Sequence, residues 1–336
     1  MLARLARELP VDGYLYEPKW DGFRCLVFRD RGEVDLRSRN QRPLARYFPE
    51  IVEALLALPQ QQLVLDGELI VARREQLDFV ALLARLHPAA SRVERLRVQT
   101  PSSFVAFDVL AVGEEDLRDW SFVERRARLE ELLGESRSPL ALTPATSDEQ
   151  VAAAWLDRFE GVVAKHRELR YEAGRRAMVK VKKERTADCV VAGFRWLVDR
   201  PLPSSLLLGL YDEGVLRHVG IAAGFAEPRR RELLERLAPL AVPLPGHPWE
   251  YGFRLAGSPT GRLKGSAGSW TPGEMEQDWV PVAPQLVAEV AYDQLDDRRF
   301  RHPGRLRRWR PDRDPESCTL EQLEAPIGGL PELLPW

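Results

Sequence analysis

The chain has 336 residues, 44% of them hydrophobic and 30% charged, with a formal net charge of −2, which indicates a globular protein of about two domains and excludes a polycation. No apolar run approaches the roughly 18 residues of a membrane span, and the N-terminus lacks the apolar region of a signal peptide. Three separated cysteines without a CxxC motif exclude a disulfide framework and a zinc site, so we expect a reduced, cytoplasmic protein.

The first half of the chain alternates strand and helix patterns. Apolar runs at residues 63–71 and 104–110 predict strands, and shorter runs at 161–165 and 177–182 predict two more. Helices are predicted over residues 44–58, 77–86, 121–133 and 147–159. The last two begin with capping-box patterns, Ser121-x-x-Glu124 and Ser147-x-x-Gln150.

The pattern changes at about residue 187. Short β-type runs then follow one another at residues 189–197, 205–211, 216–225 and 286–292, with one predicted helix at 227–237. Short strands with glycine turns and a single helix are typical of a small β-barrel. We therefore predict an α+β chain with a first domain at residues 1–185, a barrel domain at 186–314 and an acidic tail at 315–336.

Lysine is rare in this chain, because six of the 49 basic residues are lysine and the other 43 are arginine. An amine can lose its proton and attack an electrophile, whereas a guanidinium stays protonated in proteins. The lysines are therefore candidates for nucleophilic chemistry: Lys19, Lys165, Lys180, Lys182, Lys183 and Lys264.

Arginine is concentrated near the C-terminus, where residues 298–313 contain eight arginines and one acid, Asp312. Such a basic stripe is typical of a surface that binds a polyphosphate or a nucleic-acid backbone. The alternative is a solvated face without a ligand, which the interleaved Phe300 and Trp309 make less favourable.

Lys19 lies in a Lys-x-Asp-Gly motif, which alone is typical of any strand followed by a tight turn. Further motifs follow it in order: Ser38-Arg39-Asn40, Asp66-Gly67-Glu68-Leu69, Phe107-Asp108, EGVVAK at residues 160–165, Lys180-Val181-Lys182 and Arg310-Pro311-Asp312-Arg313. This ordered set resembles the covalent nucleotidyltransferase superfamily of DNA ligases, RNA ligases and mRNA capping enzymes. Within it, the chain is most similar to bacterial ATP-dependent DNA ligases of the ligase C type, from residue 17 to about residue 314.

The resemblance implies an adenylation domain followed by an OB-fold domain. It implies that Lys19 attacks the α-phosphorus of ATP and forms lysyl–AMP with the help of Mg²⁺ or Mn²⁺. AMP then passes to the 5′-phosphate of nicked double-stranded DNA, and the 3′-hydroxyl displaces it. We expect a monomer that serves DNA repair, supplied with nicks by a repair polymerase or a DNA-end-binding protein.

Lys180 and Lys182 would assist Lys19. A free lysine has a reference pKa of about 10.4, and neighbouring cations disfavour its protonated form. Two amines spaced i, i+2 on a strand lie on one face, where both can also hold the α-phosphate. The alternative is a strand edge that lysines protect from pairing.

By resemblance, four further residues hold the nucleotide and the metal. Glu17 accepts a hydrogen bond from the 6-amino group of adenine, and the carbonyl of guanine would be repelled there. Phe107 stacks on the base, although a core aromatic is the commoner role of such a residue. Glu68 binds the ribose, and Glu160 with Glu68 binds the metal, although each also fits a simple turn acid.

Several arginines match positions at which the family contacts phosphates or ribose. A guanidinium group suits these contacts because it can donate two parallel hydrogen bonds to phosphate oxygens. Arg24 and Arg39 match contacts to the ribose and the 5′-phosphate of the nick, and Arg176 is a weaker candidate. Arg310 and Arg313 belong to the last motif, which orients pyrophosphate, and Arg313 replaces the usual lysine. Lys165 and Lys264 have no assigned role.

Two other functions fit parts of the pattern. An RNA ligase or capping enzyme would use the same lysine chemistry, but Glu17 argues against GTP. A non-catalytic nucleic-acid-binding module would need only the barrel and the arginine stripe, and label transfer from ATP to the protein distinguishes it from an enzyme.

Overall fold

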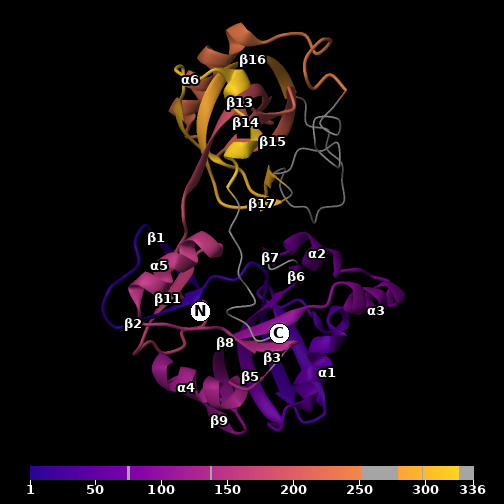
Figure 1. Ribbon diagram of the computed structural model, residues 1–336, viewed down its shortest axis with the longest axis vertical. Helices are drawn as coiled ribbons and strands as arrows, with labels where there is room; N and C mark the ends of the chain where they lie inside the picture. The colour runs from indigo at the N-terminus through magenta and orange to yellow at the C-terminus, as the bar shows by residue number, and fades with distance from the viewer. Residues whose placement is uncertain (74–75, 137, 252–278, 297, 325–336) are drawn as a thin grey trace. The chain divides into compact units, whose positions relative to one another are not determined.

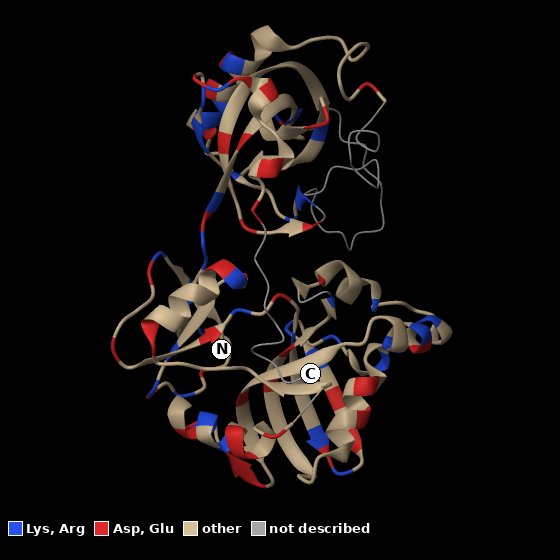
Figure 2. Cartoon of the chain, viewed as in Figure 1, with Lys and Arg blue, Asp and Glu red and all other residues tan. Residues whose placement is uncertain are grey.

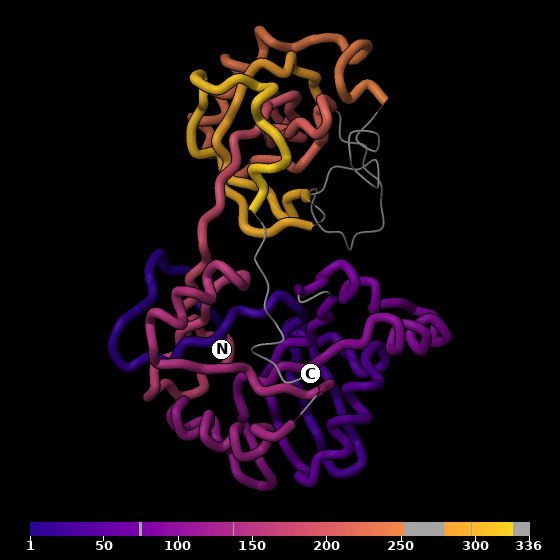
Figure 3. The backbone as a smooth tube through the Cα atoms, viewed as in Figure 1, coloured from indigo at the N-terminus to yellow at the C-terminus, as the bar shows by residue number. Residues whose placement is uncertain are grey.

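The computed structural model describes residues 1–336 except 74–75, 137, 252–278, 297 and 325–336. The chain divides into two compact units, whose described residues are 1–183 and 184–324. Figure 3 traces the backbone through the first unit in indigo and magenta and through the second mainly in orange and yellow. Each unit has its own buried apolar core. In the described ranges, no helix combines the length and the apolar character that crossing a membrane requires.

A four-stranded sheet in the first unit joins segments from both of its ends (Figure 1). Its strands, in pairing order, are β1 (Ala3–Ala6), β12 (Met178–Val181), β11 (Val162–His166) and β2 (Tyr14–Pro18). β1 runs parallel to β12, and the other neighbours are antiparallel. Helix α5 (Glu149–Arg158) packs against β2 and β11 and buries Ala152 and Trp155 in their core.

A second sheet forms the other half of this unit. Its pairing order is β10 (Leu140–Leu142), β8 (Ser103–Val112), β5 (Gln62–Ile70), β3 (Phe23–Asp30) and β4 (Glu33–Ser38), with β9 (Glu115–Asp116) beside β8. Helices α1 (Pro49–Ala57) and α4 (Phe122–Leu133) pack on it and bury Ile51, Leu55 and Leu129. Between β5 and β8 the chain forms β6 (Ala72–Arg73), β7 (Gln76–Leu77), α2 (Phe79–Ala84) and α3 (Ala90–Gln99).

Side-chain caps fix where two predicted helices begin. The capping box at Ser121 is confirmed, because its hydroxyl accepts from the backbone of Glu124 while the Glu124 carboxylate accepts from the backbone of Ser121. The capping box predicted at Ser147 is wrong. Asp148 caps α5 instead, and its carboxylate accepts from two backbone N–H groups of the first turn at 2.8 and 3.4 Å.

The second unit is built around a five-stranded antiparallel sheet. Its strands, in pairing order, are β15 (Val215–Ala223), β14 (Pro203–Asp212), β13 (Arg185–Trp196), β16 (Trp279–Tyr292) and β19 (Arg305–Trp309). Helix α6 (Glu227–Leu237) buries Leu233 and Leu237 in its core, and β17 (Leu295–Asp296) pairs with β18 (Arg299–Phe300). An isolated bridge from Ala222 to Gly304 brings the two edges of the sheet together. The predicted α+β class is confirmed, and the barrel is OB-like but not closed by a continuous ladder in the described residues.

The beginning of the predicted acidic tail packs onto the second unit. Cys318 is fully buried, and Thr319 forms a bridge with Tyr211 of β14. Residues 325–336 lie outside the described part of the chain.

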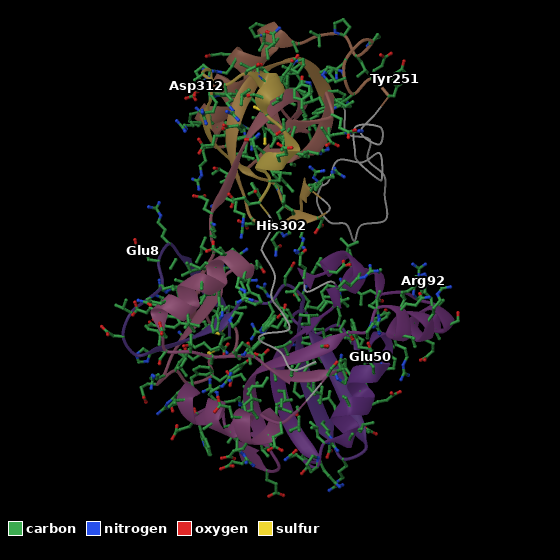
Figure 4. All side chains as sticks on the ribbon, in the orientation of Figure 1. Glu8, Glu50, Arg92, Tyr251, His302 and Asp312 are labelled. Carbon is green, nitrogen blue, oxygen red and sulfur yellow. The ribbon has the colours of Figure 1, made fainter. Side chains whose placement is uncertain are left out.

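The arginine stripe at residues 298–313 is compensated within the second unit. Figure 2 colours acidic residues red among the blue basic ones, and Figure 4 labels Asp312, the partner of Arg310. The acidic partners of these arginines are Glu184, Asp188, Asp212, Glu289, Asp296 and Asp312. Arg299 differs, because it is buried and donates to His218. The stripe is therefore not a run of uncompensated cations.

Candidate active site

Lys19 directly follows β2, at the point where that strand meets the beginning of β11. Its backbone N–H donates to the carbonyl oxygen of Gly161 at 2.8 Å. Only glycine fits at position 161, because a Cβ atom there would stand 2.2 Å from the carbonyl oxygen of Val181. This close pairing brings Lys19, Glu160 and Lys182 together at one end of the strands β2, β11 and β12.

Glu160 lies between two lysine side chains. Its Oε2 atom accepts from Nζ of Lys19, and its Oε1 atom lies 2.6 Å from Nζ of Lys182. The Glu160 side chain is 8% exposed and that of Lys19 is 24% exposed. Burial opposes ionisation of Glu160, but the two ammonium groups overcome it and hold its pKa below the ordinary value. The cluster is therefore an ionised carboxylate with a partly accessible amine.

Lys180 lies within β12, opposite Val163 of β11, which in turn lies opposite Glu17 of β2. Residues in one row across neighbouring strands point to the same face of a sheet. Lys180 and Glu17 therefore share a face. β12 ends at Val181, so Lys182 lies just beyond the strand.

Glu68 lies in β5, against the turn that follows Lys19. A Cβ atom on Gly22 would stand 2.1 Å from the carbonyl oxygen of Leu69 and 2.9 Å from Cγ of Glu68, so the glycine allows the turn to pack on the strand. Burial raises the pKa of Glu68 to about 8, and the Glu160 charge adds to this while the Lys19 ammonium opposes it. A cation bound near Glu68 and Glu160 would stabilise the ionised form of both carboxyl groups.

Glu17 and Lys165 form a buried ion pair between β2 and β11. Nζ of Lys165 lies 2.8 Å from Oε2 of Glu17, and neither side chain is more than 3% exposed. The same amine donates to the carbonyl oxygen of Phe107 at 2.8 Å and lies 4.8 Å from the centroid of its ring. Phe107 is only partly buried, whereas its neighbours Ala106 and Asp108 are buried. The Phe107 ring is therefore not a simple core side chain.

Arg24 is the cross-strand neighbour of Glu68, but its guanidinium binds Asp66. It donates to both carboxylate oxygens of Asp66, at 2.9 and 2.5 Å, and the hydroxyl of Tyr171 donates to the same carboxylate at 2.8 Å. The guanidinium carbon lies 5.8 Å from the centroid of the Phe107 ring. Asp66 and Tyr171 thus hold Arg24 beside the ring that was predicted to stack on the base.

The other four predicted site residues come from other segments of the chain. Arg39 follows β4 and Arg176 precedes β12, and both are exposed, without a hydrogen-bond or ion-pair partner among the described residues. Arg310 and Arg313 belong to the second unit, where their guanidinium groups lie 2.8 and 3.5 Å from the carboxylate of Asp188. Lys264 lies outside the described residues.

Comparison with protein families covers both units. The family model for the ATP dependent DNA ligase domain matches residues 1–182, and that for the ATP dependent DNA ligase C terminal region matches residues 199–313. The chain belongs to the ATP-dependent DNA ligase family. The resemblance and the two expected folds, nucleotidyltransferase and OB, are therefore confirmed.

Two relatives of this ligase match along nearly its whole length. DNA ligase C2 of Mycolicibacterium smegmatis and DNA ligase C of Mycobacterium tuberculosis are each 46% identical to it, across 97% of this chain and 94% of theirs. The multifunctional non-homologous end joining DNA repair protein LigD of Mycobacterium tuberculosis is 31% identical across 93% of this chain, which matches 38% of LigD. A solved structure of a Lig E DNA ligase shares the fold, with a TM-score of 0.54 and 19% identity across 92% of this chain and 99% of that one.

The glutamates of this ligase fit a shared divalent cation. Mg²⁺ prefers oxygen ligands and keeps several waters, so one or two carboxylates together with phosphate oxygens can hold it. Glu68 and Glu160 supply such carboxylates, and the described residues contain no group of three or more His, Cys, Asp or Glu side chains that could hold a metal. These two carboxylates therefore fit a cation that also binds phosphate oxygens.

Sequence reasoning missed three contacts of the site. Asp66 precedes Gly67-Glu68 in a quoted motif, but only the fold shows that it binds Arg24. The rarity of lysine pointed to Lys165 without giving its partner. No sequence pattern marked Asp188 as the partner of Arg310 and Arg313. Their contact depends on the pairing of β19 with β16 and of β16 with β13.

Proposed function

We propose that Lys19 is the nucleophile of an ATP-dependent DNA-joining reaction. The observation that supports this is the contact of Lys19 with Glu160, whose second oxygen holds Lys182. Nζ of Lys19 would attack the α-phosphorus of ATP and release pyrophosphate, which leaves AMP on the lysine. The AMP would pass to the 5′-phosphate of a nick, and the 3′-hydroxyl would then displace it to form the phosphodiester.

Attack requires a neutral amine, so Lys19 must lose a proton and leave its ion pair with Glu160. We assign Lys180 and Lys182 to this step and to the α-phosphate. Both lysines would place positive charge beside the reacting amine and the α-phosphate. The same cations stabilise the charge that develops on the phosphoryl oxygens.

The nucleotide would lie between the two sheets of the first unit. We assign Glu17 to the 6-amino group of adenine, Phe107 to the face of the base and Glu68 to the ribose. Arg24 would bind the ribose or a phosphate, and its position beside the Phe107 ring supports this assignment. Glu17 comes from β2 of one sheet, and the other three come from the neighbouring strands β8, β5 and β3 of the second sheet.

We assign the metal to Glu68 and Glu160, and its identity to Mg²⁺ or Mn²⁺. When bound, the cation neutralises phosphate charge and polarises the α-phosphate. Glu160 would then contribute to holding the cation as well as to the contacts with Lys19 and Lys182.

The exposed arginines would bind the remaining phosphates. Arg39 and Arg176 are accessible and suit the nick and the nucleotide, respectively. We assign Arg310 and Arg313 to the pyrophosphate leaving group, with Arg313 in place of the usual lysine. The adenylation domain would comprise residues 1–185, and the OB domain residues 186–314.

The partner would be nicked double-stranded DNA, and the role would be DNA repair in the cytoplasm by a monomer. The name of LigD, which includes end joining and DNA repair, supports this role. A repair polymerase or an end-binding protein would deliver the nick, since the affinity of phosphate-dominated binding falls steeply with salt.

Label transfer tests the proposed function. The protein is incubated with Mg²⁺ and α-labelled ATP or GTP, analysed on a denaturing gel and then mixed with 5′-phosphorylated nicked duplex. Covalent label from ATP that nicked DNA discharges supports the ligase. Label from GTP indicates a capping enzyme, and no label from folded, AMP-free protein indicates a binding module.

A further inference from the structure

Lys165 connects the two sheets of the first unit at the proposed base site. It belongs to β11 of the four-stranded sheet, yet its amine donates to the backbone of Phe107 in β8 of the other sheet. The side chain is 2% exposed, and its amine lies over the rings of Phe107 and Phe122, at 4.8 and 4.5 Å from their centroids. Lysine is almost never buried so completely unless its charge is paired, and the pairing partner here is Glu17.

The environment of Glu17 would neutralise it without this partner. Burial raises the pKa of Glu17, Lys165 and Arg126 oppose that effect, and Asp108 adds to it. Arg126 is the more distant cation, because its guanidinium lies 3.8 Å from Oε1 of Glu17. Oε1 accepts no hydrogen bond among the described residues, so this oxygen remains an acceptor for a ligand.

The protonation state of Glu17 decides which base it can bind. A carboxylate only accepts hydrogen bonds, and the 6-amino group of adenine donates one. A neutral carboxyl group also carries a donor, which the 6-carbonyl oxygen of guanine can accept. Loss of the charge on Glu17 would therefore weaken the preference for adenine.

We propose that Lys165 is a positioning residue that keeps Glu17 a pure acceptor, fixes it relative to Phe107 and so sets the preference for ATP over GTP. The inference rests on the proposed function, in which Lys19 is adenylated and Glu17 binds the base. Lys165 itself need not touch the nucleotide, because both of its polar contacts are to the protein.

The test compares Lys165→Met with Lys183→Met. Lys183 is a matched control because it is exposed and its ammonium pairs with Asp157 of α5 at 2.7 Å, outside the contacts of Glu17 and Phe107. Adenylation of Lys19 is measured with labelled ATP and GTP over a range of concentrations. For Lys165→Met, we expect the KM for ATP to rise about 10- to 100-fold while kcat changes less than about threefold. The preference for ATP over GTP should fall at least about tenfold, and the control should match the wild type.

The pH profile separates this role from a purely structural one. In Lys165→Met, the KM for ATP should fall as pH rises, because burial raises the pKa of Glu17 and the carboxyl group then ionises without its partner. The wild type should show no such trend. An unchanged KM and an unchanged nucleotide preference in folded Lys165→Met would overturn the inference. Failure of the wild type to accept label from ATP would instead refute the proposed function.

A second pair of variants covers the case in which Lys165→Met does not fold. Glu17→Gln with Lys165→Met removes both charges, so no unpaired charge remains buried. We expect this double variant to fold and to match Glu17→Gln alone in KM and in nucleotide preference. A double variant that is much weaker than Glu17→Gln, or that does not fold, would show that Lys165 acts independently of Glu17 and would overturn the inference.

Discussion

The ion pair between Asp108 and Arg125 is expected to be a main determinant of stability in the first unit. Both oxygens of Asp108 accept from the guanidinium, at 2.8 and 3.0 Å, and the two side chains are 1% and 0% exposed. Asp108→Asn would leave the Arg125 charge buried without its counter-ion. Removing the charge of one partner of a buried ion pair lowers the free energy of unfolding by about 3–5 kcal/mol.

Urea unfolding measures this effect. The free energy of unfolding falls by about 2 kcal/mol per molar urea, so the midpoint of unfolding should fall by about 1.5–2.5 M. Hydrogen exchange of peptides from residues 1–183 follows the first unit separately from the second. Asp116→Asn is the control, because Asp116 pairs with Arg118 at the surface and its loss should leave the midpoint unchanged. If Asp108→Asn also leaves the midpoint unchanged, the reasoning about the buried pair is refuted.

Three further variants test the site and the second unit. Gly161→Ala places a Cβ atom 2.2 Å from the Val181 carbonyl oxygen and should slow single-turnover adenylation at least about tenfold, whereas Gly32→Ala, with nothing within 4 Å, should not. Lys182→Met should lower the same rate about 100-fold at saturating ATP, and a rate near that of the wild type would exclude Lys182 from the transition state. Burial and neighbouring arginines hold the pKa of His218 well below its ordinary 6.5, so below pH 6.5 the unfolded state binds a proton that the folded state does not. His218 should therefore lower the free energy of unfolding of the second unit by up to about 1.4 kcal/mol per pH unit below pH 6.5, and urea titrations of His218→Gln should show a slope smaller by that amount. The pKa of His247 is also lowered by burial, so part of the slope remains in this variant.

Local signals predicted the elements whose determinants lie within one segment. The helix at residues 122–133 follows from the Ser121 cap and an apolar stripe, and both are present in the structure. Helix α3 was not predicted, because Val93 is its one buried residue and most of its other side chains are polar or charged. The cap of α5 was assigned to the wrong residue, since Ser147 and Asp148 are both good caps and the geometry favours Asp148.

The order of motifs predicted which residues form the site, but not their contacts. Lys19 and Glu160 are 141 positions apart, and their ion pair depends on β2 pairing with β11. The pairing of Lys165 with Glu17 depends on the same register, which a sequence pattern does not specify. Roles that require closely placed atoms therefore came from the fold, whereas the chemical class came from the residue types.

Mapping the adenylated residue tests the central claim most directly. The protein is incubated with ATP and Mg²⁺, digested and analysed by mass spectrometry, and Lys19→Ala is tested in parallel for sealing of nicked duplex. We predict that AMP is attached to Lys19 and that Lys19→Ala neither accepts AMP nor seals. AMP on another lysine, or sealing by Lys19→Ala, would contradict the account.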